Sequence, residues 1–198
     1  MDLGKKRDYS AVAVVEREDR ARAFLGPQFQ SLRVQYLERM ALGTPYAEVV
    51  KRVAEILEHP LLQQNCWLAV DATGVGAPVL EMLRAARLPC RPTAVTITAG
   101  EHSHDRGGEW TVPKKDLMAG LLVLLENGQL RIPRGLAEAE RLLKELGDIR
   151  MSPRAGGRVG MGAEGYGEHD DLALALALAC WRAQRKEIGF GTRRLPGI

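Results

Sequence analysis

The chain has 198 residues, of which 45% are hydrophobic and 27% are charged, and its formal net charge at pH 7 is +3. This length fits one domain with a substantial core, and the composition is that of a soluble globular protein. No apolar run reaches the length of a membrane span and the N-terminus lacks the apolar core of a signal peptide, so we expect an intracellular protein that binds no membrane.

The first half of the chain predicts strands that alternate with helices. Runs of β-branched and apolar residues predict a short strand near residues 2–4 and longer ones at 10–15, 20–25 and 67–71, with the charged residues 16–20 as a hairpin turn. Apolar residues at helical spacing predict helices over 45–57, which Thr44 and Pro45 begin, and over 78–86. The strand at 67–71 ends in Asp71, and a turn containing Gly74 follows it.

The second half predicts further β/α units and a glycine-rich segment. A strand is expected over 91–98, a polar loop over 100–110, a helix over 114–126, a strand over 130–132 and a helix over 136–146 that Gly147 closes. The many glycines of residues 154–167 exclude a helix interior and predict a mobile loop or a hairpin. Together these elements predict an α/β fold, a mixed β-sheet flanked by α-helices. We expect one domain over residues 1–185 and a flexible C-terminal tail over 186–198.

The segment from Leu172 to Trp181 predicts the most buried helix of the chain. Its alternation of leucine and alanine fits a strand of period two, but alanine is the best helix former and the run is longer than an ordinary strand. In a helix, its leucines point in several directions, so the helix is apolar nearly all round. We therefore expect it to lie inside the domain.

Acidic residues stand at three points where elements begin or end. His169, Asp170 and Asp171 precede the buried helix, Asp71 ends an apolar strand, and Asp2 lies in the first strand. Taken singly, each has a structural explanation as a helix cap or turn residue. Two adjacent carboxylates repel each other unless a cation lies beside them, and strand ends and helix starts can meet at one edge of a sheet. A carboxylate site suits Mg²⁺ or Mn²⁺, and two such ions can support phosphodiester cleavage.

Basic residues in two segments are candidates for contacts with nucleic-acid phosphates. Arg154 and Arg158 lie in the glycine-rich segment immediately before the acidic helix, and Lys114 and Lys115, which begin another helix, are weaker candidates. Basic clusters are usually solvated surface, and a net charge of +3 permits a polyanionic partner without requiring one. Phosphate contacts by these side chains would make binding depend strongly on salt.

Three ordered motifs resemble a known family. Asp2-Leu3-Gly4, then Val70-Asp71-Ala72-Thr73-Gly74, then His169-Asp170-Asp171-Leu172 before an alanine-rich helix are similar to the nuclease domain of the large terminase subunit of tailed bacteriophages. The likeness covers nearly the whole chain in the right order. It implies an RNase H-like fold of the RuvC-like nuclease superfamily and a two-metal-ion endodeoxyribonuclease that cleaves double-stranded DNA during genome packaging.

The resemblance also implies roles for residues and partners. Asp2, Asp71 and Asp171 would be catalytic metal ligands, with Asp170 and His169 as further ligand candidates of two Mg²⁺ or Mn²⁺ ions. The implied partners are double-stranded DNA, the terminase ATPase domain, the small terminase subunit and the portal, in the cytoplasm of the infected bacterial host. No P-loop pattern occurs in this sequence, so we expect the ATPase domain to be absent from this chain.

Other functions fit parts of the same pattern. A RuvC-type junction resolvase or a transposase-like nuclease would share the acids and differ in substrate. A phosphate-binding ATPase or sugar-kinase-like domain would explain the glycines after Asp2 and Asp71, but it leaves the acids before the last helix without a role. A DNA-binding module without catalysis is a third alternative.

Overall fold

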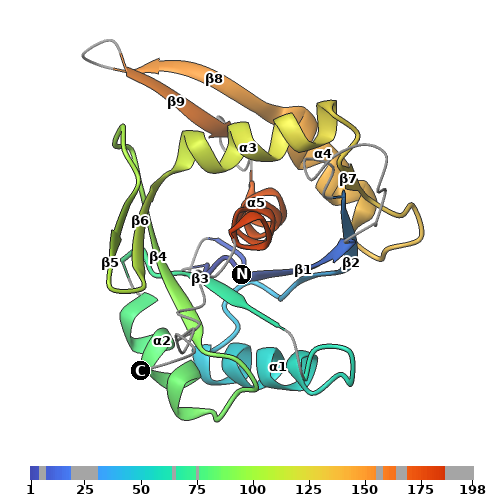
Figure 1. Ribbon diagram of the computed structural model, residues 1–198, viewed down its shortest axis with the longest axis vertical. Coiled ribbons are helices and arrows are strands. Elements are labelled where there is room, and N and C mark those ends of the chain that lie inside the picture. Colours follow the sequence, from blue (N-terminus) through green and yellow to red (C-terminus); the bar gives the residue numbers. More distant parts are fainter. Residues whose placement is uncertain are drawn as a thin grey trace, which may run out of the picture.

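The computed structural model describes residues 1–4, 8–18, 31–63, 66–74, 76–154, 158–163 and 169–185 (Figure 1). The strands are β1 (Ala11–Glu18), β2 (Ser31–Arg39), β3 (Leu68–Asp71), β4 (Pro92–Thr98), β5 (His104–Arg106), β6 (Glu109–Pro113), β7 (Leu130–Arg131), β8 (Ile149–Arg154) and β9 (Arg158–Ala163). The helices are α1 (Tyr46–Leu57), α2 (Gly76–Ala85), α3 (Lys114–Glu126), α4 (Ala139–Asp148) and α5 (Asp171–Gln184). The predicted α/β architecture is confirmed, and the expected tail over 186–198 lies outside the described residues.

The first residues of the chain join two groups of strands. In one group, β1 pairs antiparallel with β2, and β2 pairs parallel with β7. In the other, β3, β4 and β6 are parallel and β5 pairs antiparallel with β6. Between them, Asp2 forms a β-bridge with Ala11, and the Asp71 N–H donates to the Met1 carbonyl oxygen at 3.1 Å. The short strand predicted near residues 2–4 is thus a link between β1 and β3, and the sheet is mixed as predicted.

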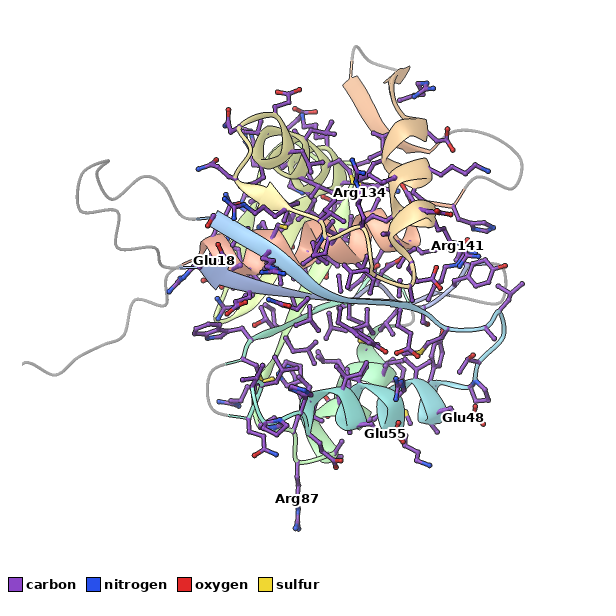
Figure 2. All side chains as sticks on the ribbon, turned by 90° about the vertical axis from the view of Figure 1, so that its right-hand side faces the viewer. Glu18, Glu48, Glu55, Arg87, Arg134 and Arg141 are labelled. Atoms are coloured by element: carbon purple, nitrogen blue, oxygen red, sulfur yellow. The ribbon has the colours of Figure 1, made fainter. Side chains whose placement is uncertain are left out.

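Helices cover both faces of this sheet. Helices α1 and α2 pack on one face, where Val49, Val53 and Leu83 belong to one hydrophobic core. Helices α3, α4 and α5 lie on the other face, with α5 between the sheet and α3 (Figure 1). In Figure 2, side chains fill the layers on both sides of the β1–β2 pair, while charged Glu48 and Glu55 of α1 lie on the outer surface.

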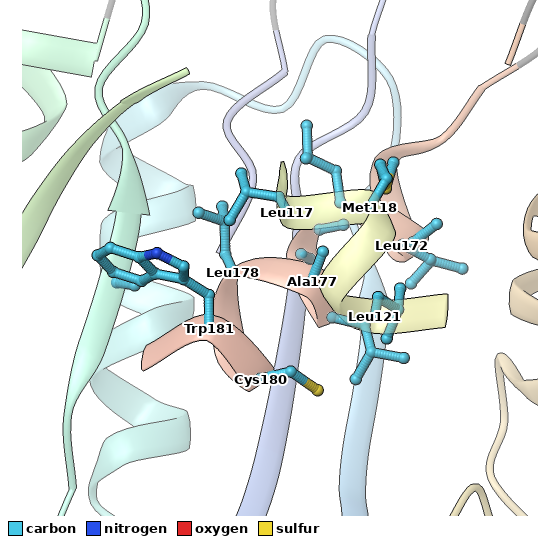
Figure 3. Packing of buried hydrophobic residues seen from close by; sticks show 14 of the residues in the cluster. Leu117, Met118, Leu121, Leu172, Ala177, Leu178, Cys180 and Trp181 are labelled. Atoms are coloured by element: carbon cyan, nitrogen blue, oxygen red, sulfur yellow. The ribbon is translucent and has the colours of Figure 1, made fainter. Parts of the chain in front are cut away.

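Helix α5 is the centre of the larger core. Every residue from Asp171 to Leu178 is buried, and Leu172, Leu176 and Leu178 are fully so. Figure 3 shows its side chains packed against Leu117 and Leu121 of α3. Replacing one of these leucines by alanine would cost about 2–5 kcal/mol of stability. The predicted buried helix is confirmed, and none of the described helices is both long and apolar enough to span a bilayer.

Strand β2 was not predicted, and the hairpin turn at residues 16–20 is wrong in part. Strand β1 continues through Glu18, and β2 pairs with it from Ser31 to Arg39. Buried and exposed residues alternate from Leu32 to Gln35, and the pattern then shifts by one residue, where the register between β1 and β2 is irregular. The third strand expected over 20–25 lies outside the described residues.

Two further predictions need correction. The polar loop expected over 100–110 contains β5 and the start of β6, which pair across a turn in which Gly107 and Gly108 have positive φ angles of 65° and 94°. Cross-strand pairing, not apolar content, makes these strands. Helix α4 runs to Asp148, so Gly147 does not close it. The described residues of the glycine-rich segment belong to a hairpin of β8 and β9, in which Arg154 pairs with Arg158 and β9 lies against α3 and α4.

Candidate metal centre

The alternation of side chains along β3 directs Asp71 toward α5. Leu68 and Val70 belong to the core beneath α1 and α2, whereas Ala69 belongs to the core around α5. Since successive side chains of a strand point to opposite faces, Asp71 lies on the same face as Ala69. The strand end therefore delivers a carboxylate to the α5 side of the sheet.

The same alternation directs Asp2 to this face. Met1 and Leu3 belong to the core beneath α1 and α2, so Asp2 between them points toward α5. Asp171 is the first residue of α5, which packs on β1 and β3. The charges of Asp71 and Asp171 both act on the Asp2 carboxyl group, which agrees with their convergence. The structure therefore brings the three predicted acids together.

All three carboxylates are removed from water, with exposed fractions of 6% for Asp2, 8% for Asp71 and 4% for Asp171. Burial raises the pKa of Asp2 well above its usual value, and the negative charges of Asp71 and Asp171 raise it further. Burial also raises the pKa of Asp171 to about 6, while the nearby His169 acts in the opposite direction. Acids that disfavour one another's ionisation in this way would be stabilised by a bound cation.

Asp71 has a structural role in addition to its place in the cluster. Its Oδ1 accepts a hydrogen bond from the Thr73 N–H at 2.8 Å, and the Thr73 Oγ1 accepts one from the Ile97 N–H of β4 at 2.8 Å. Gly74 then takes a positive φ of 70°. The turn after β3 thus fixes one carboxylate oxygen of Asp71 and links the turn to the neighbouring strand, while the same carboxylate lies on the α5 side of the sheet.

Asp170 and Asp171 are adjacent but differently placed. Asp170 precedes α5, and its Oδ2 lies 2.5 Å from the Lys114 Nζ at the start of α3. Asp171 is more buried, and no hydrogen-bond donor in the described parts of the chain reaches its Oδ2. The His169 Nδ1 is 3.7 Å from that oxygen. A buried carboxylate oxygen without a donor is costly, and a metal ion would be a suitable partner.

Arg39 and Glu145 border the cluster, and neither was predicted from the sequence. The Arg39 guanidinium stacks on the Tyr9 ring at 3.9 Å, and the Tyr9 ring meets the His169 ring edge to face at 5.1 Å. Glu145 of α4 is only 5% exposed, and burial raises its pKa to about 7. One signal could have revealed Glu145: it lies three residues after Leu142, on the buried stripe of α4, where a charged side chain is unexpected.

The predicted DNA-contacting residues divide into two groups. The structure engages both lysines in ion pairs, Lys114 with Asp170 and Lys115 with Glu101. Arg154 and Arg158 end the two strands of the β8–β9 hairpin, and their side chains lie outside what the structure describes. Lys114 therefore borders the acidic cluster directly.

The donor chemistry fits a hard divalent cation. Mg²⁺ and Mn²⁺ prefer carboxylate oxygens as ligands, and the cluster offers buried ones, of which the Asp171 Oδ2 has no hydrogen-bond donor among the described residues. Within the described ranges, no three histidine, cysteine, aspartate or glutamate side chains are already arranged to hold an ion. The aspartate side chains would therefore have to move for an ion to bind.

Comparison with known proteins identifies the fold. No protein-family model matches the sequence, and no curated protein sequence matches it. The large terminase nuclease from thermophilic phage G20c is 25% identical, with a TM-score of 0.60 over 93% of this chain and 80% of that chain. The same nuclease with bound magnesium is 24% identical, with a TM-score of 0.57 over 88% of this chain and 82% of that chain.

A second phage nuclease has a similar structure. The nuclease domain of the large terminase subunit of bacterial virus Sf6, as a mutant with manganese and beta-thujaplicinol, is 14% identical, with a TM-score of 0.56 over 88% of this chain and 89% of that chain. The resemblance predicted from the motifs is therefore confirmed at the level of the fold. The chain has the RNase H-like fold of large terminase nuclease domains.

Proposed function

We propose that this protein is a metal-dependent endonuclease that cleaves double-stranded DNA during viral genome packaging. The observation that carries the proposal is the convergence of Asp2, Asp71 and Asp171, all buried, at the first turn of α5. The fold shared with the phage nucleases supports it, as do the magnesium bound to the G20c nuclease and the manganese bound to the Sf6 domain.

We assign Asp2, Asp71 and Asp171 as the residues that would hold two Mg²⁺ or Mn²⁺ ions. Such ions would supply an activated water molecule and stabilise the departing oxygen in phosphodiester hydrolysis. The protein positions these groups through its backbone. Asp71 is held by the Thr73 N–H, and Asp171 by its place in a buried helix. Asp170 and His169 stand at the edge of the cluster as further ligand candidates.

Residues around the cluster would hold the DNA. The Lys114 ammonium, 2.5 Å from Asp170 Oδ2, is close enough to the acids to contact a phosphate bound there. Arg154 and Arg158 lie on the hairpin that packs on α3 and α4, and Lys115 lies next to Lys114. These basic groups would grip phosphates without reading base edges, as a nuclease that cuts many sequences requires.

The proposal includes the partners of this nuclease. Residues 1–185 would act as one nuclease domain that works with the terminase ATPase domain, the small terminase subunit and the portal in the cytoplasm of the infected host. Contact with these partners would control when the domain cuts.

Cleavage of supercoiled plasmid tests this function. We expect nicked and linear products with Mg²⁺ or Mn²⁺ and none with excess EDTA, because carboxylates alone cannot activate the water. A synthetic four-way junction in the same assay separates a packaging nuclease from a junction resolvase. Activity that survives the chelator, or cleavage confined to the junction, would contradict the proposal.

A further inference from the structure

Helix α5 begins with a cap that comes from another helix. Asp170 occupies the N-cap position, but within the described chain its side chain makes no capping hydrogen bond. Instead the Ala173 N–H donates to the Glu145 Oε2 of α4 at 2.9 Å. The first N–H groups of a helix need acceptors, and Glu145 supplies one from 28 residues earlier in the chain. The turn that carries Asp171 is therefore bonded to α4.

Capping a helix with a buried glutamate costs folding free energy, because the carboxylate loses its contact with water. An aspartate at the N-cap can satisfy the same N–H without burying a carboxylate between two helices, but the Asp170 side chain pairs with Lys114 instead. Glu145 is 5% exposed, and no hydrogen-bond donor in the described parts of the chain reaches its Oε1. The Arg39 Nη1 lies 3.8 Å from this oxygen. The negative charge of Asp171 also disfavours the ionised form of Glu145 and raises its pKa.

Arg39 extends the connection to the other side of the cluster. It belongs to β2, its guanidinium lies over the Tyr9 ring at 3.9 Å, and that ring meets His169 edge to face. Glu145 and Arg39 thus hold the segment around Asp171 from α4 and from the sheet. The sheet is also what carries Asp2 and Asp71.

We propose that Glu145 is a positioning residue of the metal centre: by bonding the first turn of α5 to α4, it fixes the Asp171 carboxylate relative to Asp2 and Asp71. This inference rests on the proposed function, because it needs Asp171 to be a metal ligand. Glu145 itself does not coordinate the ion. Its contribution passes through the Ala173 N–H.

Direct Mn²⁺ binding tests the role without relying on cleavage. We compare Glu145→Ala, which removes the acceptor, with Glu145→Gln, which keeps an acceptor oxygen and loses the charge. Glu140→Ala is the matched control, since Glu140 is exposed on the same helix. Mn²⁺ affinity is measured by calorimetry on the full chain well below the melting temperature of each variant, and cleavage is measured against Mn²⁺ concentration.

We expect Glu145→Ala to weaken Mn²⁺ binding by about 10-fold or more, the effect typical of residues that orient metal ligands. Saturating Mn²⁺ should restore most of its cleavage rate. Glu145→Gln and Glu140→Ala should bind Mn²⁺ within about threefold of wild type, since neither loses the bond to α5. If Glu145→Ala does not fold, Glu145→Asp takes its place, because its shorter side chain draws the oxygen away from the Ala173 N–H and should weaken binding as well.

The outcomes are distinct. Wild-type Mn²⁺ affinity in the acceptor-lacking variant, with a lowered melting temperature, would reduce Glu145 to a stabilising cap. An equal defect in Glu145→Gln would make the charge itself decisive and overturn the positioning role. A wild-type protein that neither binds Mn²⁺ nor cuts DNA would instead refute the proposed function, so the two failures can be told apart.

Discussion

Asp71 combines a backbone hydrogen bond and a buried negative charge, and one substitution can separate them. In Asp71→Asn the amide oxygen can still accept from the Thr73 N–H, now 2.8 Å from Oδ1, so the turn should keep its shape. The charge that a divalent ion needs is lost. We expect plasmid cleavage to fall below detection while the melting temperature without metal stays equal or rises, because a buried, repelled carboxylate has been removed.

Asp105 provides the matched control for this variant. Its Oδ1 accepts a hydrogen bond from the Gly108 N–H at 2.9 Å, so Asp105→Asn also keeps a backbone bond and loses one charge, on the exposed strand β5. Its cleavage rate should equal that of the wild type. Wild-type cleavage by Asp71→Asn would remove Asp71 from the site.

The adjacent aspartates should respond differently to the same change. Asp171 has a buried oxygen that no donor from the described residues reaches, whereas Asp170 is paired with Lys114. We expect Asp171→Asn to abolish cleavage and Asp170→Asn to reduce it by about 10-fold or less, as for a residue beside the ligands. Single-turnover cleavage at saturating Mn²⁺ measures both. Equal tolerance of both substitutions would make the start of α5 a helix cap only.

At the level of elements, the sequence predicted what depends on local pattern. The alanine-rich run from Leu172 predicted a buried helix, because helix propensity and an apolar surface all round agree there. Strand β2 was missed because its alternation shifts by one residue after Gln35, where its register with β1 is irregular, and β5 because only its pairing with β6 makes it a strand. Elements of that kind depend on partners that a local pattern does not contain.

The candidate site follows the same division. The meeting of acids from three element ends was predictable because strand ends and helix starts can share one sheet edge, and the structure does bring Asp2, Asp71 and Asp171 together, whereas the choice of Asp171 over Asp170 came from the family resemblance. Glu145 and Arg39 were not predicted, because their role depends on the packing of α4 and β2 against the first turn of α5. The spacing of residues along the chain does not specify that packing.

The β8–β9 hairpin is the element predicted to hold DNA. Arg154 and Arg158 pair at its end, and the hairpin lies against α3, which begins at Lys114 beside the acids. Each lost phosphate contact should flatten the log–log dependence of DNA affinity on salt by about one unit. We expect the double variant Arg154→Ala/Arg158→Ala to flatten the slope by about two units while Mn²⁺ affinity is unchanged.

Basic residues on the opposite face of the sheet control for the loss of charge. Lys51 of α1 and Arg87 after α2 are both exposed, and Arg87 points away from the molecule in Figure 2. Their double alanine variant loses the same net charge and should keep the wild-type slope. A hairpin variant with an unchanged slope would exclude the hairpin from the DNA path.

For the molecule as a whole, the acidic cluster is a cost to folding that a metal ion would offset. Burial raises the pKa of Asp171 to about 6 and that of Glu145 to about 7, so the folded, metal-free protein holds protons that the unfolded chain has released. Stability from such groups is present at low pH and is lost as pH rises through the folded pKa values. A bound divalent ion favours the ionised carboxylates and reverses this dependence.

We therefore expect the melting temperature in EDTA to fall between pH 5 and pH 8, the interval that spans these pKa values of about 6 and about 7. Losing the proton of Asp171 over this range costs on the order of 1–2 kcal/mol, or about 3–6 °C for a chain of this size. In Asp171→Asn the fall should be smaller by that amount, since the amide does not titrate. Added Mn²⁺ should raise the melting temperature more at pH 8 than at pH 5, because the ion competes with protons for the same oxygens. Scanning calorimetry of the wild type and of Asp171→Asn at pH 5 and pH 8 tests this prediction. A wild-type melting temperature that rises with pH in EDTA would contradict it, and so would an equal gain from Mn²⁺ at the two pH values; either result would show that these acids do not form a metal-binding cluster.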